Sequence, residues 1–471
     1  MSREELEQLT KDQLVEIILL QNEQVKQLAQ LQAAFEKLQA DHEALKLKME
    51  QRSKPPTNSQ NSSQPPSRDQ KSNAPKDKRK HRHGPPQGHE KHERQFVAQP
   101  DQVVELRAKQ CAHCHAHLNE KADRLVKVNQ ITELPPAKAE VIEVRQYETV
   151  CPDCGHVQVA QPPTGLEMER TFGARLETTV VYYRQEQHLS YERTQLALRH
   201  LHGVAISQGG IDGIMRRAGD KAIHAANPIR KAVRQSAVIH SDETGSRVAG
   251  DNWWEWVFCT GKAIWHEIRF NRSEDVIQDF MQTFQAEVWV SDCYGAQLKA
   301  PTERRQLCLA HQIRNLQAVV DANPTLTWPR AMQILFRFAI HLHHQRDPLS
   351  PIQFAAQVAR VERHCDRLLQ RSLSPPDAKR LKNRYLKHRD KLFVFLDRTD
   401  VEPTNNVAER ALRPSVVHRK VMGCFRSEWG AKAFAALASV IDTAELSGVQ
   451  AFDAIQSLFG LPSLPIPTGG E

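Results

Sequence analysis

The fold of this chain is decided by AVIHSDETG, residues 237–245. Apolar residues that favour β-structure lead through His240 and Ser241 into two adjacent carboxylates, Asp242 and Glu243. Carboxylates are seldom buried without a partner, so an apolar strand that ends in acid indicates a functional site. Adjacent residues of a strand point to opposite faces, so only one of the two acids is expected to face that site.

The residues that follow predict the rest of a sheet. Apolar content and turn residues indicate two strands at residues 252–261 and 262–270, followed by a helix at 273–284 that Ser273 caps. A strand at 287–295 that ends in Asp292 comes next, and then a strand that runs into a helix at 305–320. Three antiparallel strands, a crossover helix, a parallel strand and a further strand form the order of a ribonuclease-H-like fold. In that order the first and fourth strands are neighbours, so Asp242 and Asp292 are expected to share one edge of the sheet.

Two carboxylates held this closely repel each other unless a proton or a cation neutralises them. Mg²⁺, or Mn²⁺ in its place, is the expected occupant because hard cations prefer oxygen ligands. A third acid would complete a two-ion site for phosphodiester chemistry. Glu409 is the candidate, on a helix that begins near Asn405 and Asn406. The alternatives are strand-end capping for the aspartates and a surface ion pair with Arg413 for Glu409.

Basic residues surround Glu409, which suits a place where metal and DNA phosphate meet. The candidates for DNA contact in this region are Arg410, Arg413, Arg419, Lys420 and Arg426.

Two cysteine pairs, Cys111 with Cys114 and Cys151 with Cys154, predict one structural Zn²⁺. Each CxxC turn presents two thiolates, so two turns complete a tetrahedral set. Two strands, near residues 126–132 and 140–150, would fill the segment between them. Unligated turns are the alternative, and His113, His115, His117 and His156 are substitute ligands.

Residues 190–219 predict two short helices separated by Gly203, the second capped by Ser207 and ended by Arg216 and Arg217. This is the size of a helix-turn-helix, with the two arginines as DNA contacts. An ordinary helical hairpin in the core is the alternative.

The N-terminal residues 1–50 predict a coiled coil, because a heptad frame is apolar at 8 of 11 core positions. It would join protomers of a homo-oligomer. Residues 51–95 hold seven prolines, with eleven Lys or Arg against four Asp or Glu, and predict a disordered basic linker. Polyanion binding and simple solvation are both open for that segment.

Composition excludes several classes of protein. The chain has 471 residues, 40% of them hydrophobic and 25% charged, with a formal net charge of +8. Its apolar runs are too short for a bilayer, and no signal-peptide core opens it, so a cytoplasmic, nucleoid-associated protein without membrane contact is expected. Nine cysteines in a chain of this length do not indicate a disulfide scaffold.

Five motifs, in this order, closely resemble the DDE transposases of the insertion sequence 66 family: HSDETGSRVAG, VSDCYGA, CLAHQIRNL, TNNVAERALRP and GCFRSEWGAKAF, at residues 240–250, 290–296, 308–316, 404–414 and 423–434. The resemblance covers essentially the whole chain. It implies Asp242, Asp292 and Glu409 as the catalytic triad, and a helical insertion that separates the last two.

The resemblance also implies zinc-binding and helix-turn-helix regions, DNA ends and target DNA as substrates, and small accessory proteins as partners. The expected fold is a multidomain α/β protein. It begins with a coiled coil (1–50), a linker (51–95), a zinc module (96–165) and a helical DNA-binding region (166–230). The first part of the core (235–327), the insertion (328–400), the second part of the core (401–460) and a tail (461–471) follow.

Two other functions remain open at this stage: a zinc-dependent DNA-binding regulator with an inactive core, and a nuclease that cuts without joining. The pair Cys308 and His311 offers two metal ligands, which is half a site, and packing or positioning of the neighbouring strand is the favoured interpretation.

Overall fold

The computed structural model describes residues 95–460, apart from 119–123, 135–136, 163–167 and 169, together with isolated positions between residues 10 and 62. Apart from those isolated positions, the expected coiled coil (1–50), linker (51–95) and tail (461–471) lie outside the described residues.

A mixed five-stranded sheet forms the centre of the molecule, in the order β5-β4-β3-β6-β7. The strands are β3 (Val238–Val248), β4 (Asp251–Cys259), β5 (Ile264–Arg269), β6 (Ala286–Ser291) and β7 (Thr302–Leu307). β3, β4 and β5 are antiparallel, whereas β6 is parallel to β3 and β7 is parallel to β6. The chain is therefore a mixed α/β protein, with the strand order expected from the sequence.

The hairpin between β3 and β4 turns in two residues, Ala249 and Gly250, which have φ angles of 52° and 95°. Two positive φ angles in a two-residue loop suit the twist of an antiparallel pair. The hairpin sets the register that places Asp242 opposite Val257. β3 consequently runs six residues past Asp242, so the expectation that the strand ends at this acid was wrong. Only the pairing of β3 with β6 ends there, at His240.

The two faces of the sheet carry different helices. On one face Ile239, Trp256, Phe258 and Trp289 pack in a core shared with α6 (Glu274–Met281). On the opposite face Val257 and Cys259 pack against α12 (Asn406–Met422), while Val288 and Val290 pack against α7 (Leu309–Ala322) and the helices that follow it.

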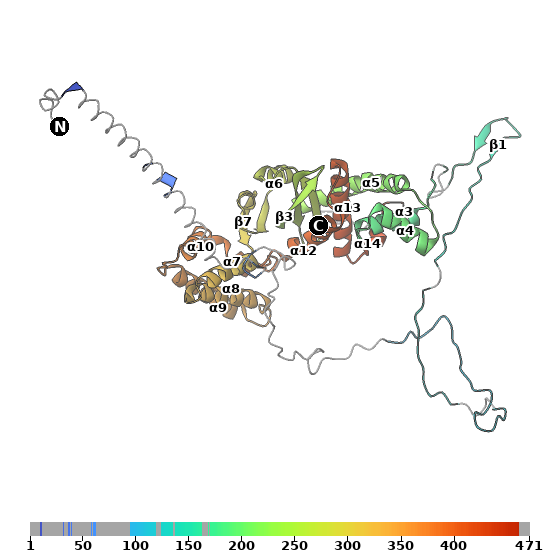
Figure 1. Cartoon of the computed structure of the whole chain (residues 1–471), viewed down its shortest axis with the longest axis horizontal. Helices are drawn as coiled ribbons and strands as arrows, with labels where there is room; N and C mark the ends of the chain where they lie inside the picture. Colours follow the sequence, from blue (N-terminus) through green and yellow to red (C-terminus); the bar gives the residue numbers. More distant parts are fainter. Residues whose placement is uncertain are drawn as a thin grey trace.

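The segment between β7 and α12 is helical, and it gathers at the β7 end of the body (Figure 1). After α7 it consists of α8 (Thr327–His344), α9 (Pro351–Leu369), α10 (Pro376–Lys387), a short 3-10 turn (Arg389–Lys391) and α11 (Val394–Asp397). A capping box, in which Ser350 and Gln353 bond each other's backbone, starts α9.

The opposite end of the body holds α3 (Ala174–Gln185), α4 (Tyr191–His202), α5 (Gln208–Arg234), α13 (Glu428–Leu446) and α14 (Ala451–Ser457) (Figure 1). Gly203 ends α4 in the left-handed region, and the Ser207 hydroxyl caps α5 by accepting the N–H of Gly210, as expected.

The expectation of a short second helix ending at Arg217 was wrong, because α5 has 27 residues. The residues after Arg217 contain no helix breaker before Pro228, which lies inside the helix. Small and aliphatic side chains recur every three or four residues along one side of α5 and are buried, and this pattern extends the helix across the body: Ala218, Ala222, Ala226, Ile229 and Val233.

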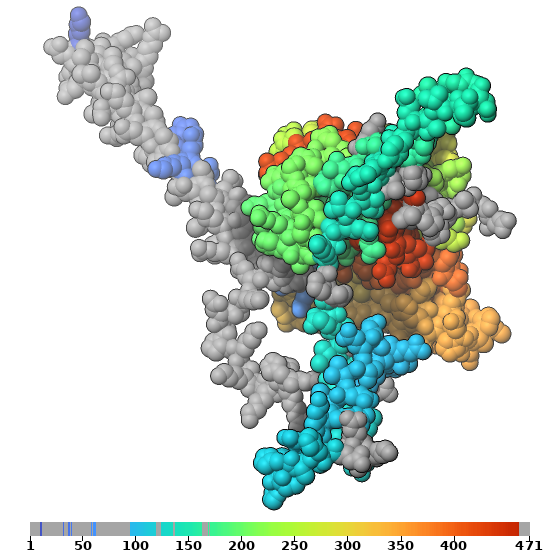
Figure 2. Space-filling view, turned by 90° about the vertical axis from the view of Figure 1, so that its right-hand side faces the viewer, coloured from blue at the N-terminus to red at the C-terminus, as the bar shows by residue number. Residues whose placement is uncertain are grey.

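The cysteine module forms an arm outside the body. In Figure 2 it runs from residue 95, in blue, to teal beside the body. Its described residues form a small hairpin, β1 (Glu148–Val150) with β2 (Val157–Val159). The strand expected near residues 126–132 is not formed, since Val126, Val128 and Ile131 are exposed and have no apolar face to cover.

None of the helices that the structure describes combines the length and apolar character needed to cross a bilayer.

Candidate functional site

Asp242 lies in β3, and Asp292 directly follows the last residue of the adjacent parallel strand β6. The register pairs His240 with Val290, and both aspartates follow these partners by two residues. Since side chains alternate along a strand, Asp242 keeps the face of His240, which α12 covers, and the same alternation would give Asp292 that face if the chain stays extended after β6. Parallel strands lie about 4.8 Å apart, so the two carboxylates are neighbours at this edge.

Both aspartates are fixed by short local hydrogen bonds. Asp242 Oδ1 accepts the backbone N–H of Glu243 at 2.9 Å, and Asp292 Oδ1 accepts that of Tyr294 at 2.8 Å. Among the described residues, no hydrogen bond reaches the other oxygen of either carboxylate, which leaves it available to a further ligand.

The surroundings of Asp242 disfavour its charge. Burial raises the pKa of Asp242 well above its ordinary value, and the negative charges of Glu243, Asp292 and Glu409 raise it further. A carboxylate in this position is stabilised by a proton or a bound cation. Among the described acids, these contributions place Asp292 and Glu409 within electrostatic reach of Asp242.

Glu243 points to the opposite face, as alternation requires, and its oxygens are occupied. Arg272 Nη2 donates to Oε1 at 2.7 Å, and Gln297 Nε2 donates to Oε2 at 2.7 Å. Gln297 also donates to the Ser241 hydroxyl at 3.2 Å. The bonds from Gln297 connect the segment after Asp292 to β3. Glu243 therefore stabilises the position of Asp292 relative to Asp242 from the opposite face of the sheet.

Glu409 lies in the first turn of α12, on the same face of the sheet as the aspartates. Ala408, Ala411 and Leu412 pack this helix on β4. The Glu409 carboxylate turns toward α7, where Arg314 Nη2 donates to its Oε1 at 3.0 Å. Its ion pair is thus with Arg314, a residue that the sequence alone did not single out, and the expected alternative partner Arg413 is exposed.

Three further ligand atoms meet beside this edge. Ligand atoms of Cys308, His311 and Glu409 lie within 4.8 Å of one another. Asp242 and Asp292 are not members of this group, although the negative charge of Glu409 contributes to the raised pKa of Asp242.

Asn405, the residue before α12, links all these elements, and it too was missed as a site residue. Its side chain is fully buried, and its Nδ2 donates to the Ser241 carbonyl at 2.8 Å. Its Oδ1 lies 3.3 Å from His240 Nδ1, and its backbone N–H donates to Cys308 Sγ at 3.1 Å. The doubled asparagine in the sequence was the available signal, which we interpreted as a helix start only.

The basic residues proposed to contact DNA from α12 divide into two groups. Arg410, Arg413 and Lys420 are exposed and recur at helical spacing along the outer side of α12. Arg419 instead faces the sheet, where its Nη1 donates to Thr244 Oγ1 at 3.4 Å. Arg426 is exposed in the loop after the helix.

Arg216 and Arg217 are both engaged within the protein. Arg216 Nε donates to Asp212 at 2.8 Å, and the guanidinium stacks 4.8 Å from the ring centre of Trp429. Arg217 pairs with the buried carboxylate of Glu177.

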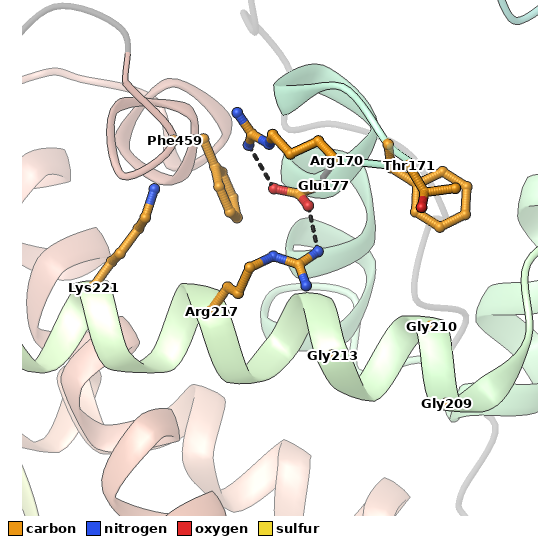
Figure 3. A pocket seen from close by; sticks show the side chains of 10 residues that line it. Arg170, Thr171, Glu177, Gly209, Gly210, Gly213, Arg217, Lys221 and Phe459 are labelled. Carbon is orange, nitrogen blue, oxygen red and sulfur yellow. Dashed lines mark hydrogen bonds and ion pairs between the residues drawn. The ribbon is translucent and has the colours of Figure 1, made fainter. Parts of the chain in front are cut away.

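Glu177 and Arg217 line a hollow of about 650 Å³ between α3 and α5 (Figure 3). Arg170 bonds the same carboxylate at 2.8 Å, and Lys221 and Phe459 close one end of the hollow. Three cationic side chains against one carboxylate give this hollow a positive charge.

The two cysteine pairs occupy matching turns. In each, the first cysteine's carbonyl accepts the N–H of the residue four positions on, and its own N–H bonds a carbonyl five positions on. Hydrogen bonds from these turns lower the pKa of Cys111 and Cys151. The four sulfurs are not brought together, since the ligand group found among the described residues contains none of them.

A family model described as Transposase IS66 family matches residues 169–433, which include the whole sheet, Asp242, Asp292 and Glu409. No curated protein matches the chain significantly.

Proposed function

The chain belongs to the IS66 family of transposases, and we propose that it cuts DNA at the ends of its element and joins the freed ends to target DNA by metal-dependent phosphoryl transfer. Asp242, Asp292 and Glu409 are the proposed catalytic residues. One observation carries this proposal: the two aspartates share a face at the paired edge of β3 and β6, and α12 brings the third acid onto the same face.

The architecture supports a ribonuclease-H-like core with a helical insertion. The strand order β5-β4-β3-β6-β7, with only β4 antiparallel to both its neighbours, is the order that we expected for this fold. The insertion would then be α8 to α11, between β7 and the helix that carries Glu409.

The donor set fits two hard cations, Mg²⁺ or Mn²⁺. It consists of carboxylate oxygens, and the pKa of Asp242 is raised by burial first and by the neighbouring negative charges second, both of which a bound cation would offset. When bound, such ions activate the attacking oxygen and stabilise the leaving one. Asp242, Asp292 and Glu409 would hold them, and Glu409 would have to leave Arg314 to do so.

The remaining residues of this face would hold the DNA. Arg419 of α12 contacts Thr244, which lies two residues after Asp242 in β3, and its guanidinium would bind a phosphate that flanks the reacting one. Arg410, Arg413 and Lys420 would extend this contact along the backbone, with Arg426 at the end of the helix. These contacts supply binding energy that is sensitive to salt.

Other parts of the chain would recognise and pair the element ends. We propose one structural Zn²⁺ at Cys111, Cys114, Cys151 and Cys154, which requires the two turns to close on each other. The α4–α5 region, with Arg216 and Arg217, would contact the terminal repeats, where DNA phosphates would have to displace Asp212 and Glu177. A coiled coil would join protomers, and small accessory proteins would assist.

The test is a strand-transfer assay with pre-cut element ends and Mg²⁺. Asp242→Asn, Asp292→Asn and Glu409→Gln are each expected to abolish joining while retaining end binding in a gel-shift assay. Asp251→Asn and Glu428→Gln are the matched controls, since both acids are exposed and lie outside the site. These controls should join ends as the unmodified protein does.

Three outcomes would change the proposal. Wild-type protein that binds ends but never cuts or joins them would be a DNA-binding regulator. Cut ends that accumulate without joined product would identify a nuclease. Joining that persists in any one of the three variants would remove that residue from the site.

A further inference from the structure

A second group of metal-binding side chains adjoins the acidic edge. Cys308, His311 and Glu409 offer a sulfur, a nitrogen and an oxygen within 4.8 Å of one another. A tetrahedral zinc with bonds of about 2.0–2.3 Å holds its ligand atoms roughly 3.3–3.8 Å apart. The three ligand atoms therefore lie within about 1–1.5 Å of the spacing that a bound ion requires.

Cys308 is placed to act as a thiolate ligand. It is fully buried as the residue before α7, and its Sγ accepts the backbone N–H of Asn405 at 3.1 Å. Backbone N–H groups of Ala310 and His311, at the start of α7, also point to this sulfur. Burial nonetheless raises the pKa of the Cys308 thiol to about 11, so the sulfur needs a cation to lose its proton near neutral pH.

His311 lies one helical turn after Cys308 and is largely buried. Its Nδ1 is buried and makes no hydrogen bond in the part of the chain that the structure describes. The Oε1 atom of Glu409 lies 3.5 Å from it. A buried ring nitrogen without a hydrogen bond is costly, and a metal ion would satisfy it.

We propose that Cys308, His311 and Glu409 form a site for a transition-metal ion of the Zn²⁺ class, with its fourth position open. Thiolate and imidazole ligands favour Zn²⁺ or Co²⁺, whereas the carboxylates of Asp242 and Asp292 favour Mg²⁺. Binding would release the Cys308 proton to solvent. Glu409 is the one side chain that both sites need.

Sharing Glu409 has a consequence that rests on the proposed function. A Zn²⁺ ion held by Cys308 and His311 would keep Glu409 at α7, away from the aspartates. Zinc would then inhibit Mg²⁺-dependent joining, and the inhibition would require Cys308.

The first test is metal content, which does not depend on catalysis. Full-length protein, stripped with a chelator and loaded with Co²⁺, is examined by elemental analysis and by its thiolate-to-cobalt absorption. Cys308→Ser and His311→Gln are each expected to lose about one equivalent per chain relative to wild type. Cys365→Ser is the matched control, because Cys365 is equally buried, lies in α9 and belongs to no ligand group among the described residues.

A second comparison distinguishes metal bound at Cys308 from any zinc bound by the paired cysteines. The quadruple variant Cys111→Ser, Cys114→Ser, Cys151→Ser and Cys154→Ser is expected to keep the Cys308-dependent equivalent. Equal metal content in wild type, Cys308→Ser and His311→Gln would overturn the proposal. His311→Gln serves if Cys308→Ser does not fold, since it leaves the bond from Asn405 to the sulfur in place.

The second test separates this site from the proposed catalysis. Asp242→Asn is expected to abolish joining but to keep the full metal content. Zinc added in stoichiometric amounts should lower joining by wild type several-fold and should have little effect on Cys308→Ser. Equal inhibition of wild type and Cys308→Ser by zinc would contradict the shared role of Glu409, even if the metal content supports the site.

Discussion

The guanidinium of Arg314 donates a hydrogen bond to the carboxylate of Glu409, with 3.0 Å between Nη2 and Oε1. The two side chains come from α7 and α12 and are about one-quarter exposed, at 26% and 25%. This ion pair engages one carboxylate oxygen of the proposed third catalytic acid. Arg314 and a catalytic metal ion therefore compete for one carboxylate.

Replacing Arg314 with Gln should ease metal binding at the acidic edge. An ion pair at a partly exposed position contributes up to about 1 kcal/mol, which corresponds to a factor of roughly five in an equilibrium constant. We expect the Mg²⁺ concentration for half-maximal joining to fall about two- to five-fold. Arg337→Gln, at an exposed position of α8, should leave it unchanged. A rise in the Mg²⁺ requirement of Arg314→Gln would mean that Arg314 helps to assemble the site.

Asn405→Ala should destabilise the protein far more than Asn406→Ala. Asn405 is buried and satisfies the Ser241 carbonyl, whereas its neighbour Asn406 is exposed. Leaving a buried polar group without its partner costs about 1–3 kcal/mol. Urea unfolding followed by circular dichroism measures both changes. Equal losses in the two variants would show that the contact with β3 contributes nothing particular.

His266 predicts a loss of stability at alkaline pH. It is buried between Glu255, 3.1 Å from Nδ1, and Asp442, 2.9 Å from Nε2. Burial alone would lower its pKa, but hydrogen bonds to Asp442 and Glu255 outweigh it and raise the pKa from 6.5 to about 9. Because the pKa of the folded state lies above that of the unfolded state, this contribution is complete below pH 6.5 and disappears as the pH rises toward 9.

The shift corresponds to about 3 kcal/mol in the free energy of unfolding. We expect wild type to lose stability between pH 6 and pH 9 by about this amount relative to His266→Gln, measured by urea unfolding at each pH. His364→Gln, exposed on α9, should follow wild type. Identical pH profiles for wild type and His266→Gln would show that the imidazole is not charged in the folded protein.

Two glycines of α5 should respond to alanine with opposite signs. A Cβ at Gly219 would lie 2.7 Å from the Cβ of Ala433 in α13, so the two helices would have to separate. Overpacking of this kind costs about 1–3 kcal/mol. A Cβ at Gly213 would meet only the end of the Arg217 side chain, at 3.6 Å. Gly213→Ala should instead stabilise the helix by about 0.5–1 kcal/mol. Thermal unfolding distinguishes the two, and stabilisation by both would contradict the close helix contact.

Local patterns in the sequence carried much of the fold. Apolar runs and Gly-containing turns located the strands of the sheet, and Gly203 and Ser207 marked helix ends that the structure confirms. The position of Asp242 was misjudged because nothing local tells a strand end from the place where one of two partner strands stops. The length of α5 was misjudged because its continuation depends on burial against α13, a contact with residues about 200 positions later.

The sequence predicted which acidic residues belong to the candidate site, but not the contacts that they make. Register and alternation place Asp242 and Asp292 together, since both follow from strand pairing. The contacts of Glu409 with Arg314 and His311, and those of Asn405 with β3, join segments separated by about 95 to 165 residues. No local periodicity reports such contacts, and a CxxH pair acquires a third ligand only when two distant helices meet.

The helix that carries Glu409 is pinned to one strand at both of its ends. Asn405 bonds the Ser241 carbonyl before α12, and after it the backbone of Phe425 bonds Arg247 and Ala249 at 3.0 and 2.9 Å. Because contacts with β3 hold both ends of α12, the helix has little freedom to shift or tilt relative to the sheet. A change of partner by Glu409, from Arg314 to a metal ion at the aspartates, would then require only rotation about side-chain bonds. It would proceed on the timescale of rotamer changes, which is shorter than that of domain movements.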